Sequence, residues 1–443
     1  MKRMVLSYLS ILCITLTGAC TKAGPDLEDV VTPSALSPET IIQTKPQITL
    51  SPKLDAFATP TPKVTEIAKE ADSFCASVVE IPLDECNALV AVYNHTDGNH
   101  WIMNNEDWIG KDDWLETNKP CSWAGIVCSD GHVIEISLPL NGLTGVLPSE
   151  IGALTRLIKL ELTDNQLSSA PLEIGNLDNL TELNLGFNQL GSLPAEISEL
   201  INLTGLYLAG NELSSVPDLS RITKLSVLNL AENHLSQTPV GLGNLTQLTY
   251  LYLAKNDLNR LPPEIGKLTN LNGLDLSENN LSDLPAEIGN LTDLLFLDLN
   301  NNHLASLPPE IGRLVNLGEL NLAWNDLDEL PSEIGGLSSV NSLFLENNQL
   351  RNLPNEIGKL TGLNMLDLSN NNLESLPEEI GNLSGLNVLY LDGNNLNELP
   401  VEINNLSNLS ELWLSDNHFT SLPPELCAVF SGIVYPQSMC VPR

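Results

Sequence analysis

Residues 271–281 read LNGLDLSENNL, with leucine at the first, fourth, sixth and eleventh places and asparagine at the ninth. The same pattern begins thirteen times, at intervals of 23 residues except for one step of 24 after the first copy and one of 22 after the fourth. The copies begin at Val133, Leu157, Leu180, Leu203, Leu225, Leu248, Leu271, Leu294, Leu317, Val340, Leu363, Leu386 and Leu409. A repeat array grows in one dimension, so this chain of 443 residues is read in repeats rather than in several globular domains.

Each copy predicts a short strand with one buried face. Leu274 and Leu276 flank Asp275, which is the period-two pattern of a half-buried strand. Stacked copies would form a parallel sheet with about 4.8 Å between strands. A Pro-x-Glu-Ile-Gly-x-Leu segment follows, in which Pro285 can open a helical turn and Gly289 can end it with a positive φ. Because this return path is bulkier than the strand, the array is expected to curve with its strands on the inside.

An asparagine occupies the ninth place of every copy. A buried polar side chain must be hydrogen-bonded, and an amide can both donate to and accept from the backbone where the chain leaves the strand. We therefore interpret this column as structural and not as part of a ligand site. Its members are Asn141, Asn165, Asn188, Asn211, Asn233, Asn256, Asn279, Asn302, Asn325, Asn348, Asn371, Asn394 and Asn417.

With this period and this asparagine column, the chain is identified as a member of the leucine-rich repeat family. The expected fold is therefore α/β: a curved horseshoe-shaped solenoid with a parallel β-sheet on its concave face and short helices and turns on its convex face. Residues 88–94, 98–101 and 120–128, with Trp108, resemble the N-terminal cap of plant leucine-rich repeat receptors. Residues 143–148 (LTGVLP) resemble the plant-type repeat, whereas the later Leu-Pro-x-Glu-Ile-Gly copies are closer to the Ras-scaffold type.

The charge of the chain excludes one class of partner. It has 56 acidic and 20 basic residues and a net charge of -36, which would repel a phosphate backbone, and no Lys/Arg cluster follows Arg3. Nucleic-acid binding is therefore not expected. Such a charge mainly favours solubility, and it is compatible with a cationic partner without indicating one by itself.

The N-terminus resembles an export signal. Lys2 and Arg3 precede an apolar run that is too short to span a bilayer and that ends in small residues before Cys20. Residues 16–20 (LTGAC) resemble a bacterial lipobox, which implies lipidation of Cys20, although Thr17 stands where the motif usually has leucine. Ordinary signal-peptidase cleavage could use the same small residues, which leaves a secreted form as the alternative. The whole chain thus resembles a bacterial leucine-rich repeat lipoprotein.

The chain is expected to divide into five segments. These are a lipoprotein-type signal peptide at 1–19, a disordered Pro- and Thr-rich tether at 20–72, an N-terminal cap at 73–132, thirteen repeats at 133–426 and a C-terminal cap at 427–443. An even number of further cysteines in an exported chain indicates disulfides. Proximity in sequence favours pairing Cys75 with Cys86, Cys121 with Cys128 and Cys427 with Cys440, although the sequence leaves fifteen connectivities open.

Residues that could carry chemistry have simpler explanations. His234, His303 and His418 share one repeat position, but three and five copies separate them, which is too far for one metal ion. Asp275 and Asp298 occupy the same strand position in neighbouring copies and could share a cation or act as paired carboxylates. No nucleophile, oxyanion motif or phosphate loop accompanies them, so we expect no enzyme, no metal and no cofactor.

Aromatic and other large side chains stand out at the strand positions expected to face solvent. On a rigid curved sheet such residues are a common basis for binding hot spots, and Asp367, Asp392, Glu411 and Asp416 could supply a polar rim. The alternative is that they only pack against one another along the sheet. The proposed ligand-binding residues are Tyr207, Tyr250, Tyr252, Phe296, Trp324, Phe344, Met365, Tyr390 and Trp413.

The sequence therefore favours a non-catalytic, lipid-anchored protein of the cell envelope that binds a protein or peptide through its concave face. The alternative is a carbohydrate-binding surface protein, because aromatic platforms beside carboxylates also suit sugar rings. An enzyme of the secreted ubiquitin-ligase type, which carries similar repeats, is disfavoured because no catalytic cysteine domain follows the array.

Overall fold

The computed structural model describes residues 74–102, 114–420, 422, 427 and 434–435. In this part of the chain the main element is a sheet of 15 strands, in which β1 pairs antiparallel with β2 and every later neighbour is parallel. The strands are β1 (Ile126–Ser129), β2 (His132–Ser137), β4 (Lys159–Glu161), β6 (Glu182–Asn184), β7 (Gly205–Tyr207), β8 (Val227–Asn229), β9 (Tyr250–Tyr252), β10 (Gly273–Asp275), β11 (Phe296–Asp298), β12 (Glu319–Asn321), β13 (Ser342–Phe344), β14 (Met365–Asp367), β15 (Val388–Tyr390), β16 (Glu411–Trp413) and β17 (Val434–Tyr435).

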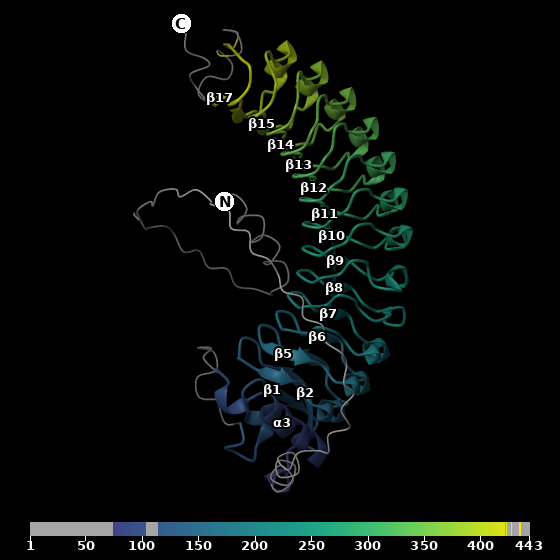
Figure 1. Cartoon of the computed structure of the whole chain (residues 1–443), viewed down its shortest axis with the longest axis vertical. Coiled ribbons are helices and arrows are strands. Elements are labelled where there is room, and N and C mark those ends of the chain that lie inside the picture. Colours follow the sequence, from purple (N-terminus) through teal and green to yellow (C-terminus); the bar gives the residue numbers. More distant parts are fainter. Residues whose placement is uncertain (1–73, 103–113, 421, 423–426, 428–433, 436–443) are drawn as a thin grey trace, which may run out of the picture. The chain divides into compact units, whose positions relative to one another are not determined.

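Each repeat adds one strand in register. Leu274 at the centre of β10 lies opposite Leu297 of β11, and Asp275 lies opposite Asp298. The central leucine is buried and its two neighbours are at least partly exposed in most copies, as the alternation of the sequence predicts. Figure 1 shows the strands lining the inner side of the curved array and the helical turns on its outer side. The expected solenoid is confirmed.

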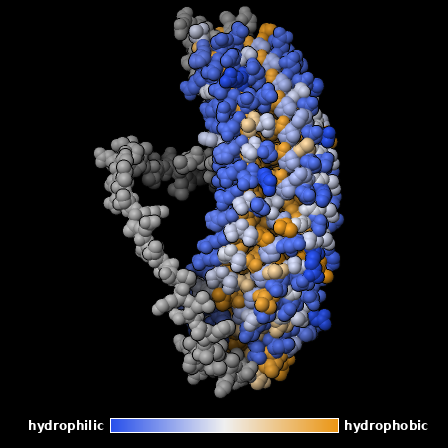
Figure 2. Space-filling view, turned by 45° about the vertical axis from the view of Figure 1, so that its right-hand side comes forward, coloured by the Kyte–Doolittle hydropathy of each residue, from blue (hydrophilic) through white to orange (hydrophobic). Residues whose placement is uncertain are grey.

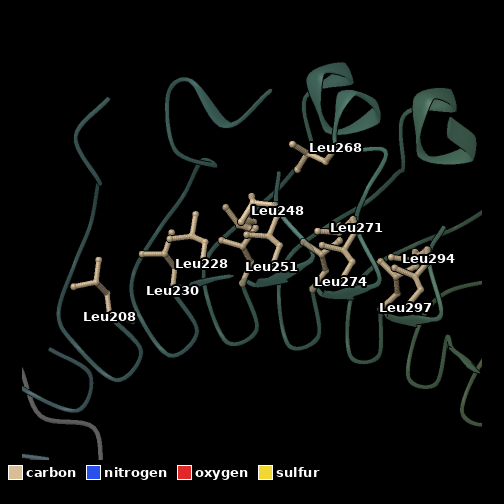
Figure 3. Close-up of a cluster of buried hydrophobic side chains, with 14 of the residues drawn as sticks. Leu208, Leu228, Leu230, Leu248, Leu251, Leu268, Leu271, Leu274, Leu294 and Leu297 are labelled. Atoms are coloured by element: carbon tan, nitrogen blue, oxygen red, sulfur yellow. The ribbon is translucent and has the colours of Figure 1, made fainter. Parts of the chain in front are cut away.

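The core is one continuous column of leucines between the strands and the outer turns. Figure 3 shows this column from Leu208 to Leu297, with the side chains directed between the sheet and the return segments. Leu274, Leu276 and Leu281 are all 0% exposed. Burial of one such side chain contributes about 1.5–3 kcal/mol, but no copy can bury its leucines without a neighbour on each side.

The return segments form short 3-10 helices, most of which begin directly after a proline. Figure 2 turns this side forward and shows it largely hydrophilic, with hydrophobic residues between the polar ones. The helices are η4 (Ser149–Ala153), η5 (Leu172–Asn176), η6 (Ala195–Glu199), η7 (Leu242–Asn244), η8 (Pro263–Lys267), η9 (Ala286–Asn290), η10 (Pro309–Arg313), η11 (Ser332–Gly336), η12 (Asn355–Lys359), η13 (Glu378–Asn382) and η14 (Val401–Asn405).

The glycine of these helices has a different role from the one predicted. Gly289 does not adopt a positive φ. Instead, a Cβ atom at Gly289 would lie 2.4 Å from the carbonyl oxygen of Glu310 in the next copy. The expectation that this glycine ends the helix with a positive φ was therefore wrong, because close packing between neighbouring copies requires it.

The asparagine column forms a hydrogen-bonded ladder, as predicted. The Oδ1 atom of Asn279 accepts from the backbone N–H of Leu258 at 3.0 Å, and its Nδ2 donates to the carbonyl of Leu253 at 2.9 Å. Both partners lie in the preceding copy, and Nδ2 also reaches the carbonyl of Leu276 in its own copy. The buried amide therefore ties neighbouring turns together.

Residues before the repeats cover the first copy. The cap contains α3 (Leu83–His95), η1 (Gly98–His100) and η3 (Pro120–Ser122), and a two-stranded sheet lies beside it, formed by β3 (Thr144–Val146) and β5 (Gln166–Ser169). Trp101, Trp114 and Trp123 are buried in this cap.

Two further links hold the cap. Disulfides join Cys75 to Cys86 and Cys121 to Cys128. The buried carboxylate of Glu85 pairs with Nδ1 of His132 at 2.6 Å and accepts the backbone N–H of Val133 at 2.8 Å, which fixes α3 to β2. This pairing gives His132 an acidic partner 47 residues away that the sequence did not reveal.

Several sequence-based expectations fall on residues outside the described part. These are the signal peptide at 1–19, Cys20, the tether and Cys440. Cys427 is disulfide-bonded. No helix among the described residues is both long and apolar enough to cross a membrane.

Candidate binding face

The concave face consists of the two residues that flank the buried leucine of each strand. Eight of the nine proposed residues occupy these places, and each is half-buried. Tyr250, Phe296 and Met365 take the first place of their strands, while Tyr207, Tyr252, Phe344, Tyr390 and Trp413 take the third.

Trp324 is not on a strand, which corrects its predicted placement. It lies three residues beyond the end of β12, with a φ of 55° and 54% of its surface exposed. The residue before the ladder asparagine has a positive φ in every copy, from Leu140 to Asp416, because the chain turns sharply there. Phe187 occupies the same place and is 47% exposed, so it is a second exposed aromatic that the sequence reading missed.

A tyrosine cluster covers β7 to β10. The rings of Tyr250 and Tyr252 are parallel within 3°, with centroids 6.3 Å apart. A Cβ atom at Gly273 would lie 2.7 Å from Tyr250, and one at Gly205 would lie 2.9 Å from Tyr207, so these glycines leave room for the rings to lie against the sheet. Burial, with smaller effects of Tyr250 and Asp275, raises the pKa of Tyr252 to about 12.

A second aromatic group lies on β13 to β16. Tyr390 and Trp413 face one another across neighbouring strands, with ring centroids 6.0 Å apart. The indole N–H of Trp413 donates to Oε2 of Glu411 at 3.1 Å. Met365 and Phe344 come from the two preceding strands, β14 and β13. One edge of this surface is thus both aromatic and acidic.

Carboxylates separate the two aromatic groups. Asp298 is 7% exposed, and its Oδ1 accepts from the backbone N–H of Asn300 at 2.9 Å, while Oδ2 accepts from Nδ2 of Asn321 at 3.3 Å. Burial, reinforced by the charge of Asp275, raises the pKa of Asp298 to about 7. Burial also raises the pKa of Asp275. The two carboxylates are adjacent, as their register predicts, and destabilise one another in the charged form.

Two glutamates extend this acidic stretch, and the sequence reading missed both. Glu319 begins β12, and burial raises its pKa. Glu346 follows β13 by two residues, and burial, with smaller effects of Asp367 and Asp298, raises its pKa to about 7. Within the described chain, Oε2 of Glu346 is buried and has no hydrogen-bond partner. Its position just beyond the strand, where other copies carry alanine or serine, was the available signal.

The expected polar rim is only partly exposed. Asp367 and Asp392 are half-buried, and Oδ1 of Asp367 accepts from the backbone and side chain of Ser369. Glu411 is half-buried beside Trp413, and Asp416 is exposed at its turn. Three of these carboxylates therefore lie on the face itself and only Asp416 at its margin.

The histidines do not converge. His234, His303 and His418 are exposed at three separate turns, and His303 lies 3.5 Å from Asp326. Among the described residues there is no group of three or more His, Cys, Asp or Glu side chains placed to hold a metal ion.

Comparison with known proteins assigns the family. A family model described as a leucine-rich repeat region matches residues 205–302, 286–364 and 341–427, which together span just over half of the chain. The chain belongs to the leucine-rich repeat family. A second leucine-rich repeat model matches residues 179–200.

This leucine-rich repeat protein is similar to plant receptors over short segments. A probable leucine-rich repeat receptor-like protein kinase of Arabidopsis thaliana is 38% identical over 85 residues, which are 17% of this chain and 9% of that protein. Phytosulfokine receptor 2 of the same plant is 39% identical over 57 residues, or 12% of this chain and 6% of the receptor. The matched segments thus span less than a tenth of these curated relatives.

Solved structures match over a longer span. The PEPR1–AtPEP1 structure is 30% identical, with 78% of this chain and 50% of that chain covered and a TM-score of 0.67. A leucine-rich repeat protein of Leptospira interrogans is 38% identical, with coverage of 67% and 81% and a TM-score of 0.56. The Arabidopsis receptor kinase HAESA, solved with a peptide hormone and a co-receptor, is 27% identical, with coverage of 76% and 66% and a TM-score of 0.55.

Proposed function

We propose that this protein is a non-catalytic binding protein of the cell envelope that recognises a protein or peptide through its concave face. The observation that carries this proposal is the row of half-exposed aromatic side chains on strands held in register by a rigid core. Such side chains offer a large contact area and lose little conformational entropy on binding. Two related structures, PEPR1–AtPEP1 and HAESA with its peptide hormone, support a peptide or protein partner.

A lipid anchor at Cys20 forms part of this proposal. The lipobox-like residues 16–20 and the Pro-rich segment that follows support it. Metabolic labelling with a fatty acid, followed by comparison of the wild-type chain with Cys20→Ala, tests the anchor. Equal labelling of both chains would contradict it, and release of unlabelled protein to the medium would indicate simple secretion.

The decisive test removes aromatic rings from the concave face. Tyr252, Phe344, Tyr390 and Trp413 are replaced together by serine, and partner capture by crosslinking on intact cells is compared with the wild type. We expect capture to be lost with little change in thermal unfolding, because these side chains are not part of the leucine core.

A matched control replaces apolar side chains elsewhere on the surface. Leu172, Val240 and Val401 are 58%, 67% and 70% exposed and lie outside the strands, so their replacement by serine should leave capture unchanged. Unchanged capture in the aromatic variant would overturn the concave-face proposal.

A carbohydrate ligand is the second candidate. Tyrosine and tryptophan rings beside carboxylates, as in the pair Trp413 and Glu411, also suit sugar rings. A glycan array run beside a protein pull-down separates the two: glycan binding that the aromatic variant abolishes, without any captured protein, would favour the carbohydrate function.

A further inference from the structure

The middle of the concave sheet carries a continuous file of carboxylates. Five consecutive copies each contribute one acidic side chain to this face or its edge, and we name this set the acidic file: Asp275, Asp298, Glu319, Glu346 and Asp367. Strands β10 to β14 are hydrogen-bonded neighbours, so these groups follow one another along the solenoid.

No cation of the protein balances this file on the same surface. Strands β9 to β16 contain no lysine or arginine. In the described chain the nearest basic side chain at the strand-to-turn edge is Lys255, which lies 3.0 Å from Glu232. Buried carboxylates without a cationic partner are costly, so this face gains most from a ligand that brings positive charge.

Aromatic rings border the acidic file. Phe296 and Phe344 lie on its strands, Tyr252 precedes it on β9, and Trp324 stands exposed at the adjoining turn. Aromatic faces attract ammonium and guanidinium groups, and the aliphatic stems of lysine and arginine also pack on them. A cation next to these rings would therefore be stabilised by both charge and contact.

We propose that the acidic file and its aromatic border bind an extended cationic peptide segment with lysine or arginine at alternate positions. The file spans four strand steps of about 4.8 Å, or roughly 19 Å, which an extended chain covers with about six residues. Alternate side chains of such a chain face the same way, so about three cations would meet the five carboxylates. This inference rests on the proposed concave-face function and gives the chemistry of its partner.

The test uses defined probes on the full chain. A fluorescein-labelled octapeptide of alternating arginine and serine, with both ends blocked, is titrated by fluorescence anisotropy, and a glutamate–serine octapeptide serves as the negative probe. The concave variant carries Asp275→Asn, Asp298→Asn, Glu319→Gln, Glu346→Gln and Asp367→Asn. We expect it to bind the arginine peptide at least about tenfold more weakly than the wild type, because close charge pairs contribute strongly to recognition.

A charge-matched control is essential because the whole chain has a net charge of -36. The outer variant neutralises the same number of exposed acids away from the strands: Asp293, Asp328, Glu329, Glu374 and Glu378. It should bind within about twofold of the wild type at 0.15 M salt, where distant exposed charges are screened. Equal loss in both variants would show attraction to the overall charge and overturn the proposal, as would no loss in either.

A smaller variant guards against misfolding. Asn184, Asn229 and Asn321 occupy the same strand place as Asp275 and Asp298, and each accepts the backbone N–H two residues later. Asp275→Asn with Asp298→Asn therefore keeps a native side chain and should still weaken binding at least about threefold.

The two proposals can fail separately. If the concave variant keeps its binding while the serine variant of the aromatic residues loses partner capture, the cationic ligand is wrong and the binding face stands. If the aromatic variant still captures its partner, the binding face itself is wrong.

Discussion

At the scale of single residues, one strand place serves either structure or recognition without a change of backbone. The third residue of the strand is Asn184 or Asn321 in some copies, Asp275 or Asp298 in others, and tyrosine elsewhere. The asparagine and aspartate side chains accept the same backbone N–H two residues on. The aspartates therefore add charge to the concave face while keeping the local hydrogen bond.

This charge predicts a pH dependence of stability. The pKa of Asp298 is raised to about 7, so the folded protein keeps a proton that the unfolded chain loses above about pH 4. The stabilisation from this proton is complete below about pH 4, declines as pH rises, and is lost above about pH 7. Stability should therefore fall with rising pH across this window.

Asp298→Asn should flatten part of that slope. We expect the variant to exceed the wild type by on the order of 1–2 kcal/mol at pH 8 and to gain less at pH 5, because a neutral amide carries no buried charge. Urea unfolding followed by circular dichroism at both pH values measures this. Parallel pH profiles for the two proteins would show that the carboxyl of Asp298 does not titrate in this range.

At the scale of elements, the outer 3-10 helices stack more tightly than a side chain allows. A Cβ atom at Gly312 of η10 would lie 2.1 Å from the carbonyl oxygen of Glu333 in the next copy, and similar contacts recur at Gly289, Gly335 and Gly381. The distance between successive return segments, and with it the curvature of the array, therefore depends on these glycines.

Gly312→Ala tests this role. The added methyl must push two copies apart, so we expect a loss of roughly 1–3 kcal/mol in the free energy of unfolding, measured with urea. Gly191→Ala is the control, because a Cβ atom there meets nothing within 4 Å. Equal stability of the two variants would mean that neighbouring copies shift apart without cost.

The sequence predicted what repeats and missed what depends on contacts between distant or irregular places. Leucine alternation and the asparagine column set the strands and the ladder, because each copy confirms the pattern of the last. The turn position of Trp324 and the packing role of Gly289 required the backbone angles and distances between copies. The pair of Glu85 with His132 spans 47 residues, and no local pattern announces it.

At the scale of the whole molecule, the array is held by nearest neighbours. Each ladder asparagine bonds to the preceding copy, and each central leucine lies opposite the leucine of the next strand. The cap closes the first copy through Glu85 and two disulfides. Such a chain should tolerate the loss of a whole copy in its middle, because the new neighbours present the same surfaces to each other.

Deletion of residues 271–293 tests this directly, because it removes one period of 23 residues and brings Leu294 to the place of Leu271. We expect a folded protein whose urea unfolding remains cooperative and whose m value falls by roughly one thirteenth, since one copy's buried surface is lost. Deletion of residues 271–281 alone is the control: it removes a strand and its asparagine but leaves the return segment, so Leu253 and Leu258 lose their ladder partner. That variant should unfold at much lower urea. If both deletions were equally stable, stacking of complete copies would not be what holds the solenoid together.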